Sequence, residues 1–369
     1  MKGRVNMVRK LSVLLLPVVL TGTAAAGDAK LRDWKGPQVN RLINQGQQIG
    51  RRPLPHPRNQ QAFHEPFKEP MTAKKIRIAI DDAIMYLRSQ QLPSGAIGAQ
   101  GGTTAVGGTA LAALAMLAAG ADPARDPGLR KALDCLAKQD IDHTYCRGIS
   151  ANTWEFALRK VPYDKGIRAA LKKDFGWLMK AAGNNPRGVW RYRQNSRDYD
   201  NSCSQYGVLG IWAAQRAGFD PGDALWKKVS KHFLATQNAN GAWGYTSGAT
   251  PNMTTAGLAS MFLVFDMYHG KNYYTRKNPR AFTEGDAAKV LASLERGMTW
   301  LGKTNNPQKE TAYYLYGIER TGVASGRKYF GGEDWFKRGA LAVLKAQHPS
   351  GAITIGSWGN HVVRTIWAA

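Results

Sequence analysis

The sequence AGADP at residues 119–123 recurs as AGFDP at residues 217–221, 98 positions further along the chain. In each copy a glycine and then a proline follow a run rich in alanine. That order is typical of a helix end, because glycine accepts the left-handed cap conformation and proline cannot continue the helix. The pair therefore predicts two equivalent helix ends, separated by two units of a repeat of about 50 residues.

Two kinds of helical segment alternate along the chain around this pair. The first kind is amphipathic and basic, as expected of half-exposed outer helices, and comprises residues 74–91, 126–139, 164–182, 222–237, 284–303 and 335–347. The second kind is rich in Gly, Ala, Ser and Thr, which suits an interior, and comprises residues 103–119, 151–159, 201–217, 253–269 and 310–323. Anchor residues near the starts of the second kind, Thr103, Asn152, Asn201, Thr254 and Thr311, lie 49, 49, 53 and 57 positions apart.

One outer and one inner helix cannot bury their apolar faces alone, so such units must stack into a solenoid or close into a ring. Scarcely any alternating β pattern occurs beyond residue 72, and the sequence predicts an all-α fold. The sixth inner segment would begin near His361, and the sequence runs only to Ala369. We therefore expect the last inner helix to be short or truncated.

Composition indicates a globular protein: of the 369 residues, 43% are hydrophobic and 21% charged. The formal net charge is +25, which would attract an anionic surface or polymer. Basic residues are scattered instead of clustered, so a solvated basic surface is the alternative, and we expect no nucleic-acid partner. Beyond residue 20 no apolar run is long enough to cross a bilayer.

The first 71 residues differ from the rest of the chain. Four basic residues precede the apolar run at residues 11–20, and three alanines follow at residues 24–26, as in a cleaved signal peptide. An uncleaved anchor is the alternative. Residues 27–71 carry six prolines and no sustained helical period, which predicts a basic, proline-rich arm or linker before a domain at residues 72–369. We expect export to a periplasmic or other extracytoplasmic location, where Cys135 and Cys146 could form a disulfide.

A second pattern follows three of the outer segments. Its best copy is LATQNANGAWG at residues 234–244; weaker copies are LRSQ at 87–90 leading to GAIG at 95–98, and LKAQ at 344–347 leading to GAI at 351–353. A terminal glutamine can bond free backbone groups at a helix end, and a tryptophan after a glycine turn can cover that turn. We expect these residues to join neighbouring units and to have a structural role.

This pattern resembles the glutamine-tryptophan repeat of squalene and hopene cyclases, and more broadly the prenyltransferase and terpenoid cyclase superfamily. The resemblance covers residues 72–369. It implies an (α/α)6 toroid of six inner and six outer helices, with the functional cavity at the N-terminal ends of the inner helices. Such helix ends present free N–H groups and positive dipole ends to a ligand. Ligand-binding candidates near these ends are Trp154, Asn201, Tyr206, Tyr313 and Tyr314.

The segment RDYDNS at residues 197–202 opens the third inner segment. It is similar to a degenerate form of the Asp-x-Asp-Asp acid motif of class II terpene cyclases, with Asn201 in place of the last acidic residue. The resemblance implies Asp200 as a general acid, with Asp198 as a second catalytic candidate. The alternative is that either aspartate is an N-cap, which bonds the first amides of the helix and opposes its dipole.

Two further site hypotheses remain. Resemblance to the zinc-dependent prenyltransferase β subunit implies a weak metal alternative made of Asp200, Cys203 and His361. A carbohydrate-active toroid, either a lyase or a hydrolase, would use Tyr199, Arg191, Arg193 and Asp200. The other histidines, His56, His64, His143, His232, His269 and His348, show no metal spacing, so we expect them at the surface or in loops.

No nucleotide-binding, dinucleotide-binding or hydrolase motif occurs in the sequence, so we expect no cofactor. The sequence therefore predicts an exported repeat protein that binds an apolar small molecule or an extended peptide or polymer in a central cavity. Peripheral contact with a membrane would suit the positive charge. The terpene-cyclase-type enzyme with Asp200 as its acid and the carbohydrate-active toroid are the alternatives, and whether the protein is an enzyme stays open.

Overall fold

The computed structural model describes residues 67–98, 102–270, 285–304 and 311–356, and this part of the chain is mostly helical. The α-helices are α3 (Ala73–Ser89), α4 (Gly102–Ala118), α5 (Pro127–Ala137), α6 (Thr144–Lys160), α7 (Lys165–Asn184), α8 (Asn201–Arg216), α9 (Asp223–Thr236), α10 (Pro251–Val264), α12 (Gly285–Thr304), α13 (Ala312–Ser325) and α14 (Trp335–Ala346). A π-helix, η2 (Phe265–Gly270), continues α10, and β1 (Tyr329–Phe330) pairs antiparallel with β2 (Glu333–Asp334). The all-α prediction is confirmed.

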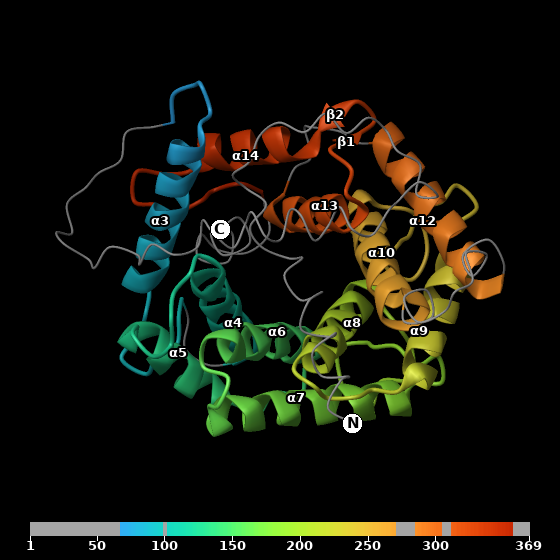
Figure 1. The fold of residues 1–369 in the computed structure, drawn as a ribbon, viewed down its shortest axis with the longest axis horizontal. Coiled ribbons are helices and arrows are strands. Elements are labelled where there is room, and N and C mark those ends of the chain that lie inside the picture. Colours follow the sequence, from blue (N-terminus) through green and yellow to red (C-terminus); the bar gives the residue numbers. More distant parts are fainter. Residues whose placement is uncertain (1–66, 99–101, 271–284, 305–310, 357–369) are drawn as a thin grey trace.

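Figure 1 shows these helices around a circuit in which α14 lies beside α3. The inner helices α4, α6, α8, α10 and α13 contact one another in that order. The outer helices α3, α5, α7, α9, α12 and α14 pack against them from outside. The predicted signal peptide and nearly all of the proline-rich arm lie outside the described residues, as does the predicted sixth inner segment. None of the described helices is both long and apolar enough to cross a membrane.

Four of the outer helices, α3, α5, α7 and α14, begin at side-chain caps, which explains why their starts are readable in the sequence. Asp126, Asp164 and Asp334 each accept a hydrogen bond from the amide three residues ahead, at the starts of α5, α7 and α14. Thr72 caps α3 in the same way. The two AGxDP segments also end helices as predicted, with Gly120 and Gly218 at positive φ values of 106° and 96°.

The inner segment predicted at residues 151–159 begins too late, because α6 starts at Thr144. The added turns contain Arg147, a charge that does not fit the expected small, apolar pattern. In the structure this arginine is buried and neutralised, since its Nη1 lies 2.7 Å from Asp174 on α7. A buried ion pair between two helices therefore hides the start of α6 from an analysis of hydropathy alone.

Three glutamines connect successive outer helices through the same arrangement. Gln91, Gln237 and Gln347 each donate from Nε2 to a glycine carbonyl in the turn that follows, at 3.1, 2.8 and 3.2 Å. The same Nε2 groups donate to a backbone carbonyl of the neighbouring outer helix, at 2.8, 2.9 and 2.8 Å. The last of these bonds, from Gln347 to Ala79, joins α14 to α3 across 268 residues of sequence.

A glycine in each turn lets the two outer helices approach closely. Gly95, Gly241 and Gly351 have positive φ values of 93°, 93° and 86°. A Cβ on these glycines would lie 2.4, 2.6 and 2.2 Å from a main-chain oxygen of the neighbouring outer helix. Any other residue would therefore clash with that helix as well as strain its own backbone.

The first of these glutamines corrects the predicted alignment by one residue. The sequence pattern places the motif at Gln90, but the Gln90 side chain donates to the neighbouring Ser89 hydroxyl, at 3.1 Å, and to no other helix in the described part of the chain. The bonds between helices come from Gln91 instead. In the other two copies the bonding glutamine, Gln237 or Gln347, is itself the C-cap of its helix. In this copy the C-cap of α3 is Gln90, so the bonding glutamine lies one residue after the C-cap.

The tryptophan of the motif has an equivalent that the pattern did not reveal. Trp243 donates from its indole to the carbonyl of Phe233, and Trp190 donates to that of Leu178, both at 2.9 Å. Each indole also lies against an inner-helix glycine, where a Cβ on Gly257 or Gly207 would overlap the ring. Asn185 stands where a glutamine precedes the other turns, which explains why this copy escaped detection.

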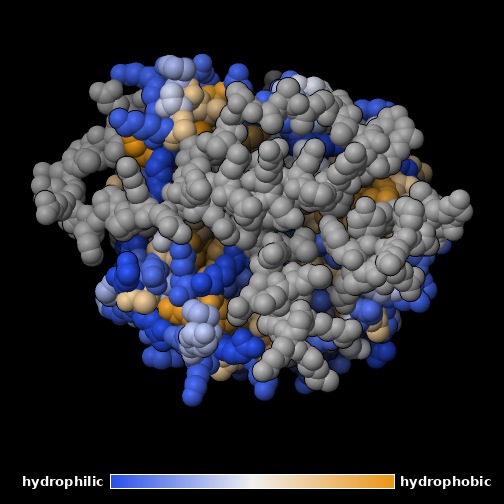
Figure 2. Space-filling model, viewed as in Figure 1, coloured by the Kyte–Doolittle hydropathy of each residue, from blue (hydrophilic) through white to orange (hydrophobic). Residues whose placement is uncertain are grey.

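Buried side chains form two groups, one around α4, α5 and α6 and one around α9, α10 and α12. Tyr145, Leu263 and Tyr313 pack against both groups and so connect them. Along the outer edge formed by α7, the surface is largely hydrophilic (Figure 2). Cys135, Cys146 and Cys203 are all free, so the disulfide considered between Cys135 and Cys146 does not form.

Replacing Gln91 by alanine is expected to lower the free energy of unfolding by about 1 to 2 kcal/mol, because one hydrogen bond to the following turn and one to α5 are lost. The adjacent Gln90→Ala variant is the matched control, and its effect should stay within about 0.5 kcal/mol. Urea unfolding followed by circular dichroism measures both changes. Equal effects of the two substitutions would contradict the assignment of the motif to Gln91.

Candidate functional site

Asp200, the central aspartate of the predicted catalytic motif, is the N-cap of α8. Its Oδ1 accepts hydrogen bonds from the amides of Ser202 and Cys203, at 2.7 and 3.3 Å, and from the Ser202 hydroxyl. The residue is only 6% exposed. This is the geometry of an N-cap, in which a carboxylate satisfies the free amides of the first turn and opposes the helix dipole.

Asp198, the second catalytic candidate, lies at the surface. Its Oδ2 is 2.6 Å from Arg191 Nη1 in a pair that is largely open to solvent. Arg193 donates to the carbonyl of Asp142 at 2.9 Å, and the Tyr199 hydroxyl donates to that of Thr246 at 2.8 Å. The residues of the carbohydrate-active alternative thus hold the loops before α8 in place.

Asn201 joins α8 to the segment after α9. Its Nδ2 donates to the Gly244 carbonyl at 2.9 Å, and its backbone amide donates to Tyr245 at 2.8 Å. Asn201 Oδ1 lies 2.9 Å from Nε2 of His232 on α9. Since an amide oxygen only accepts, Nε2 carries the ring proton. Asn201 therefore uses its side chain to connect structural elements at the entrance to α8.

His232 was expected at the surface or in a loop, and that expectation is wrong. It lies within α9 and is 3% exposed, and His269 is buried as well. Burial, with a smaller contribution from the positive charge of Arg187, lowers the pKa of His232 to about 4. The ring is therefore neutral at pH 7, which allows it to lie in the core beside Asn201.

Trp154 lies in the middle of α6, ten residues after the helix begins. Its indole donates to Asp174 Oδ2 on α7 at 2.8 Å, while the other oxygen of that carboxylate pairs with Arg147. Burial raises the pKa of Asp174 to about 6, against the opposing effect of Arg147. We expected Trp154 near a helix N-terminus. Because α6 starts at Thr144, Trp154 instead packs against the outer helix α7.

Tyr145 is the residue that takes the place expected of Trp154. It lies in the first turn of α6, and its ring centroid is 4.4 Å from that of Tyr206 on α8. Tyr206 is buried in the second turn of α8. The ring of Tyr192, in the loop before α8, is stacked 6.4 Å from that of Tyr145. The sequence could have indicated Tyr145 as an aromatic residue in the first turn of an inner helix, but only if the start of α6 had been placed at Thr144.

Tyr313 brings a third inner helix to the same place. It lies in the second position of α13, and its hydroxyl accepts a hydrogen bond from Gln205 Nε2 on α8. We call Tyr145, Tyr206 and Tyr313 the tyrosine cluster. Tyr314 follows Tyr313 directly but is buried among the side chains around α10 and α12. Consecutive helical residues point about 100° apart, so only one of the two can face α8.

The tyrosine cluster carries no charge at neutral pH. Burial, followed by the nearby phenols of Tyr313 and Tyr145, raises the pKa of Tyr206 well above its usual value. Burial likewise raises the pKa values of Tyr145 and Tyr313. At the edge of this region Tyr192 and Tyr245 are 40% and 44% exposed. The cluster is thus a neutral, aromatic contact among three inner helices.

The zinc alternative finds no assembled site in the described part of the chain. Cys203 is fully buried, and burial raises the pKa of its thiol, whereas zinc binds the thiolate. His361 lies outside the described residues, so its position relative to Asp200 is not defined. Among the residues that are described, no three His, Cys, Asp or Glu side chains gather in a way that could hold a metal ion.

No protein-family model and no curated protein matches this sequence.

His232 predicts a specific dependence of stability on pH. Its pKa is about 4 in the folded chain and about 6.5 when exposed, so between these values the unfolded chain binds the extra proton. Stability is therefore lost as the pH falls, by about 2 kcal/mol between pH 7 and pH 5 from this residue alone. A His232→Gln variant should show a correspondingly shallower decline over that range in chemical unfolding.

The exposed His348 provides the matched control. His348→Gln is expected to keep the wild-type decline in unfolding free energy. If His232→Gln also keeps the full decline, the burial of a neutral imidazole at position 232 is contradicted.

Proposed function

We propose that the protein is an (α/α)6 toroid built from a repeat of about 50 residues, related to the prenyltransferase and squalene-hopene cyclase proteins. Support comes from the alternation of inner and outer helices and from the three equivalent glutamine bonds between outer helices. The bond from Gln347 to Ala79 is the strongest support, because it links the last described outer helix to the first.

The protein, in this proposal, binds an extended and largely apolar ligand at the N-terminal ends of its inner helices. The observation that carries the proposal is the tyrosine cluster, to which three inner helices contribute one phenol each. Binding sites for small molecules are typically apolar and aromatic with a few polar groups that orient the ligand, and the hydroxyl groups here would have that role. A peptide with apolar side chains is the alternative ligand for this site.

The proposal includes binding and no chemical step. Asp200 is the one acid at the tyrosine cluster that the sequence singled out, and its Oδ1 already accepts hydrogen bonds from two amides and a hydroxyl. Removing that carboxylate would expose the first-turn amides of α8, so its structural role accounts for its presence. The terpene-cyclase-type enzyme therefore remains an alternative that the Asp200→Asn variant below tests.

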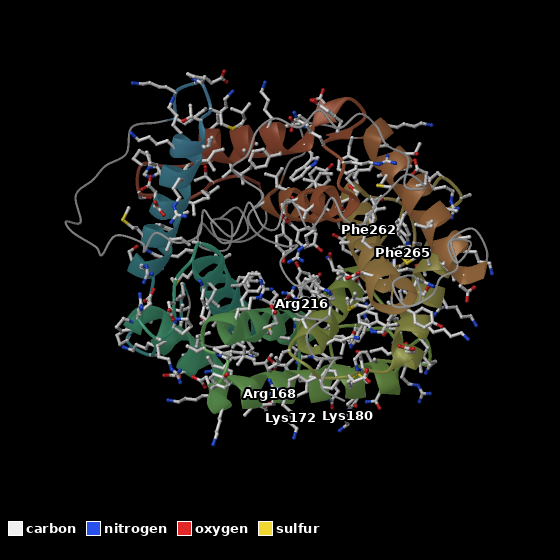
Figure 3. The ribbon with its side chains drawn as sticks, viewed as in Figure 1. Arg168, Lys172, Lys180, Arg216, Phe262 and Phe265 are labelled. Atoms are coloured by element: carbon white, nitrogen blue, oxygen red, sulfur yellow. The ribbon has the colours of Figure 1, made fainter. Side chains whose placement is uncertain are left out.

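The proposal also includes export of the protein and its contact with an anionic surface. Support for the anionic partner comes from α7, where Arg168, Lys172 and Lys180 point away from the circuit of helices (Figure 3). All three are exposed, and together with the net charge of +25 they would attract a negatively charged polymer or membrane surface.

Mass spectrometry of the full chain, purified without denaturant and analysed under native and then denaturing conditions, tests the proposal. We expect the wild type to retain an apolar small molecule or peptide. Tyr313→Ala and Tyr206→Ala should each reduce the retained amount by at least about 10-fold, because each removes an aromatic face and a hydroxyl. Melting curves of each variant establish that it is folded.

Two variants serve as controls. Trp154→Phe removes a hydrogen bond to α7 and should lower stability without changing retention. Asp200→Asn keeps a good helix cap and should also retain the ligand. A wild-type protein with nothing bound, or tyrosine variants that retain as much as the wild type, would contradict the proposal. Accumulation of a chemically different ligand in Asp200→Asn alone would favour the enzyme.

A further inference from the structure

Arg320 on α13 is a buried cation without a counter-ion among the described residues. It is 7% exposed, and neither its Nε nor its Nη1 has a hydrogen-bond partner within the part of the chain that the structure describes. Two other inner-helix arginines with buried side chains do have carboxylate partners. Arg147 pairs with Asp174 at 2.7 Å, and Arg216 pairs with Glu155 at 2.9 Å. Arg320 therefore differs from Arg147 and Arg216, each of which has a carboxylate partner.

An unpaired buried charge is costly, so its presence calls for an explanation. Burial lowers the pKa of Arg320 to about 10, and the side chain still carries its charge at neutral pH. The ring of Tyr316 lies 4.1 Å from the guanidinium carbon and offers a partial cation-π compensation. That contact leaves Nε and Nη1 of the guanidinium without a hydrogen-bond acceptor among the described residues.

The location of Arg320 connects it to the tyrosine cluster. Tyr313, Tyr316 and Arg320 are spaced by three and four residues, so they share one face of α13. Tyr313 on this face reaches Gln205 of α8, the residue next to Tyr206 of the tyrosine cluster. Seven helical residues rise about 10 Å, which places Arg320 about that distance further along the helix than Tyr313.

A neighbouring acid does not compete for the guanidinium. Glu319 precedes Arg320 on α13, but Nε and Nη1 of Arg320 have no hydrogen-bond partner among the described residues. Burial raises the pKa of Glu319 to about 8, so this carboxyl group is mostly protonated and neutral at pH 7. The positive charge of Arg320 therefore has no neutralising carboxylate from its neighbour on α13.

We infer that Arg320 is the binding site for an oxyanion, a carboxylate or a phosphate, at the head of the ligand whose apolar part lies along the tyrosine cluster. The inference rests on the proposed function and narrows its ligand class to an amphiphile with one acidic head. Guanidinium groups form strong, charge-assisted hydrogen bonds with both kinds of oxyanion. Such a ligand supplies the counter-charge and the acceptors that the buried arginine lacks.

Isothermal titration of the full chain with octanoate, octyl phosphate, octanol and inorganic phosphate tests this inference. We expect at least one of the two acids to bind at least about 10-fold more tightly than octanol, as one charge-assisted hydrogen bond would provide. Arg320→Met should abolish this preference and leave the ligand-free protein as stable as the wild type or more stable, because it removes an unpaired buried charge. Which acid binds better identifies the head group.

Arg125→Met is the matched control, since it removes the same charge from an exposed turn before α5. It should keep the wild-type preference for the acids. If Arg320→Met does not fold, Arg320→Lys retains the charge and should keep a weaker preference. Binding of inorganic phosphate as tight as that of octyl phosphate would assign the site to free phosphate instead of an amphiphile.

Equal binding of octanol and both acids by the wild type, or no binding of either acid, would overturn the oxyanion site. The same holds if Arg320→Met keeps the preference for the acids. These failures can be distinguished from failure of the proposed function. A neutral ligand that the wild type retains and the tyrosine variants lose would support binding at the tyrosine cluster. That result would exclude only the role of Arg320.

Discussion

The bond between a helix-terminal glutamine and the neighbouring outer helix is the interaction on which the rest of the structure depends. A backbone carbonyl has two lone pairs, and within a helix only one is used by the helix itself. Gln237 and Gln347 donate to carbonyls inside α12 and α3, while a glycine in the following turn permits the close approach that this requires. The geometry fixes the spacing of the outer helices and, through them, the positions of the inner helices that carry the tyrosine cluster.

Outer helices could be predicted from the sequence because their determinants are local. Aspartate caps at Asp126, Asp164 and Asp334 begin three of them, and the amphipathic period extends to their ends. Inner helices were harder to delimit, because they are buried on most faces and lack that period. The start of α6 depends on an ion pair between Arg147 and Asp174, which are separated by 27 residues and belong to different helices.

The candidate site could be predicted only in part, because the direction of a side chain depends on where its helix starts and on its position around the helix. Tyr206 and Tyr313 were expected at inner-helix N-termini and do contact α6 and α8 residues there. Trp154 and Tyr314 are aromatic residues of similar appearance in the sequence, yet one lies too far along its helix and the other is rotated away. Arg320 and His232 gave no signal at all, since the burial of a charged or titratable side chain is decided by tertiary packing.

The proposed toroid makes the first and last described outer helices neighbours, whereas an open spiral would separate them most. Pulsed electron paramagnetic resonance can distinguish these arrangements with spin labels at the exposed positions Met85 on α3, Lys345 on α14 and Lys231 on α9, in a Cys135→Ala background. We predict a shorter distance for the pair at 85 and 345 than for the pair at 85 and 231. A longer distance between 85 and 345 than between 85 and 231 would contradict closure between α14 and α3.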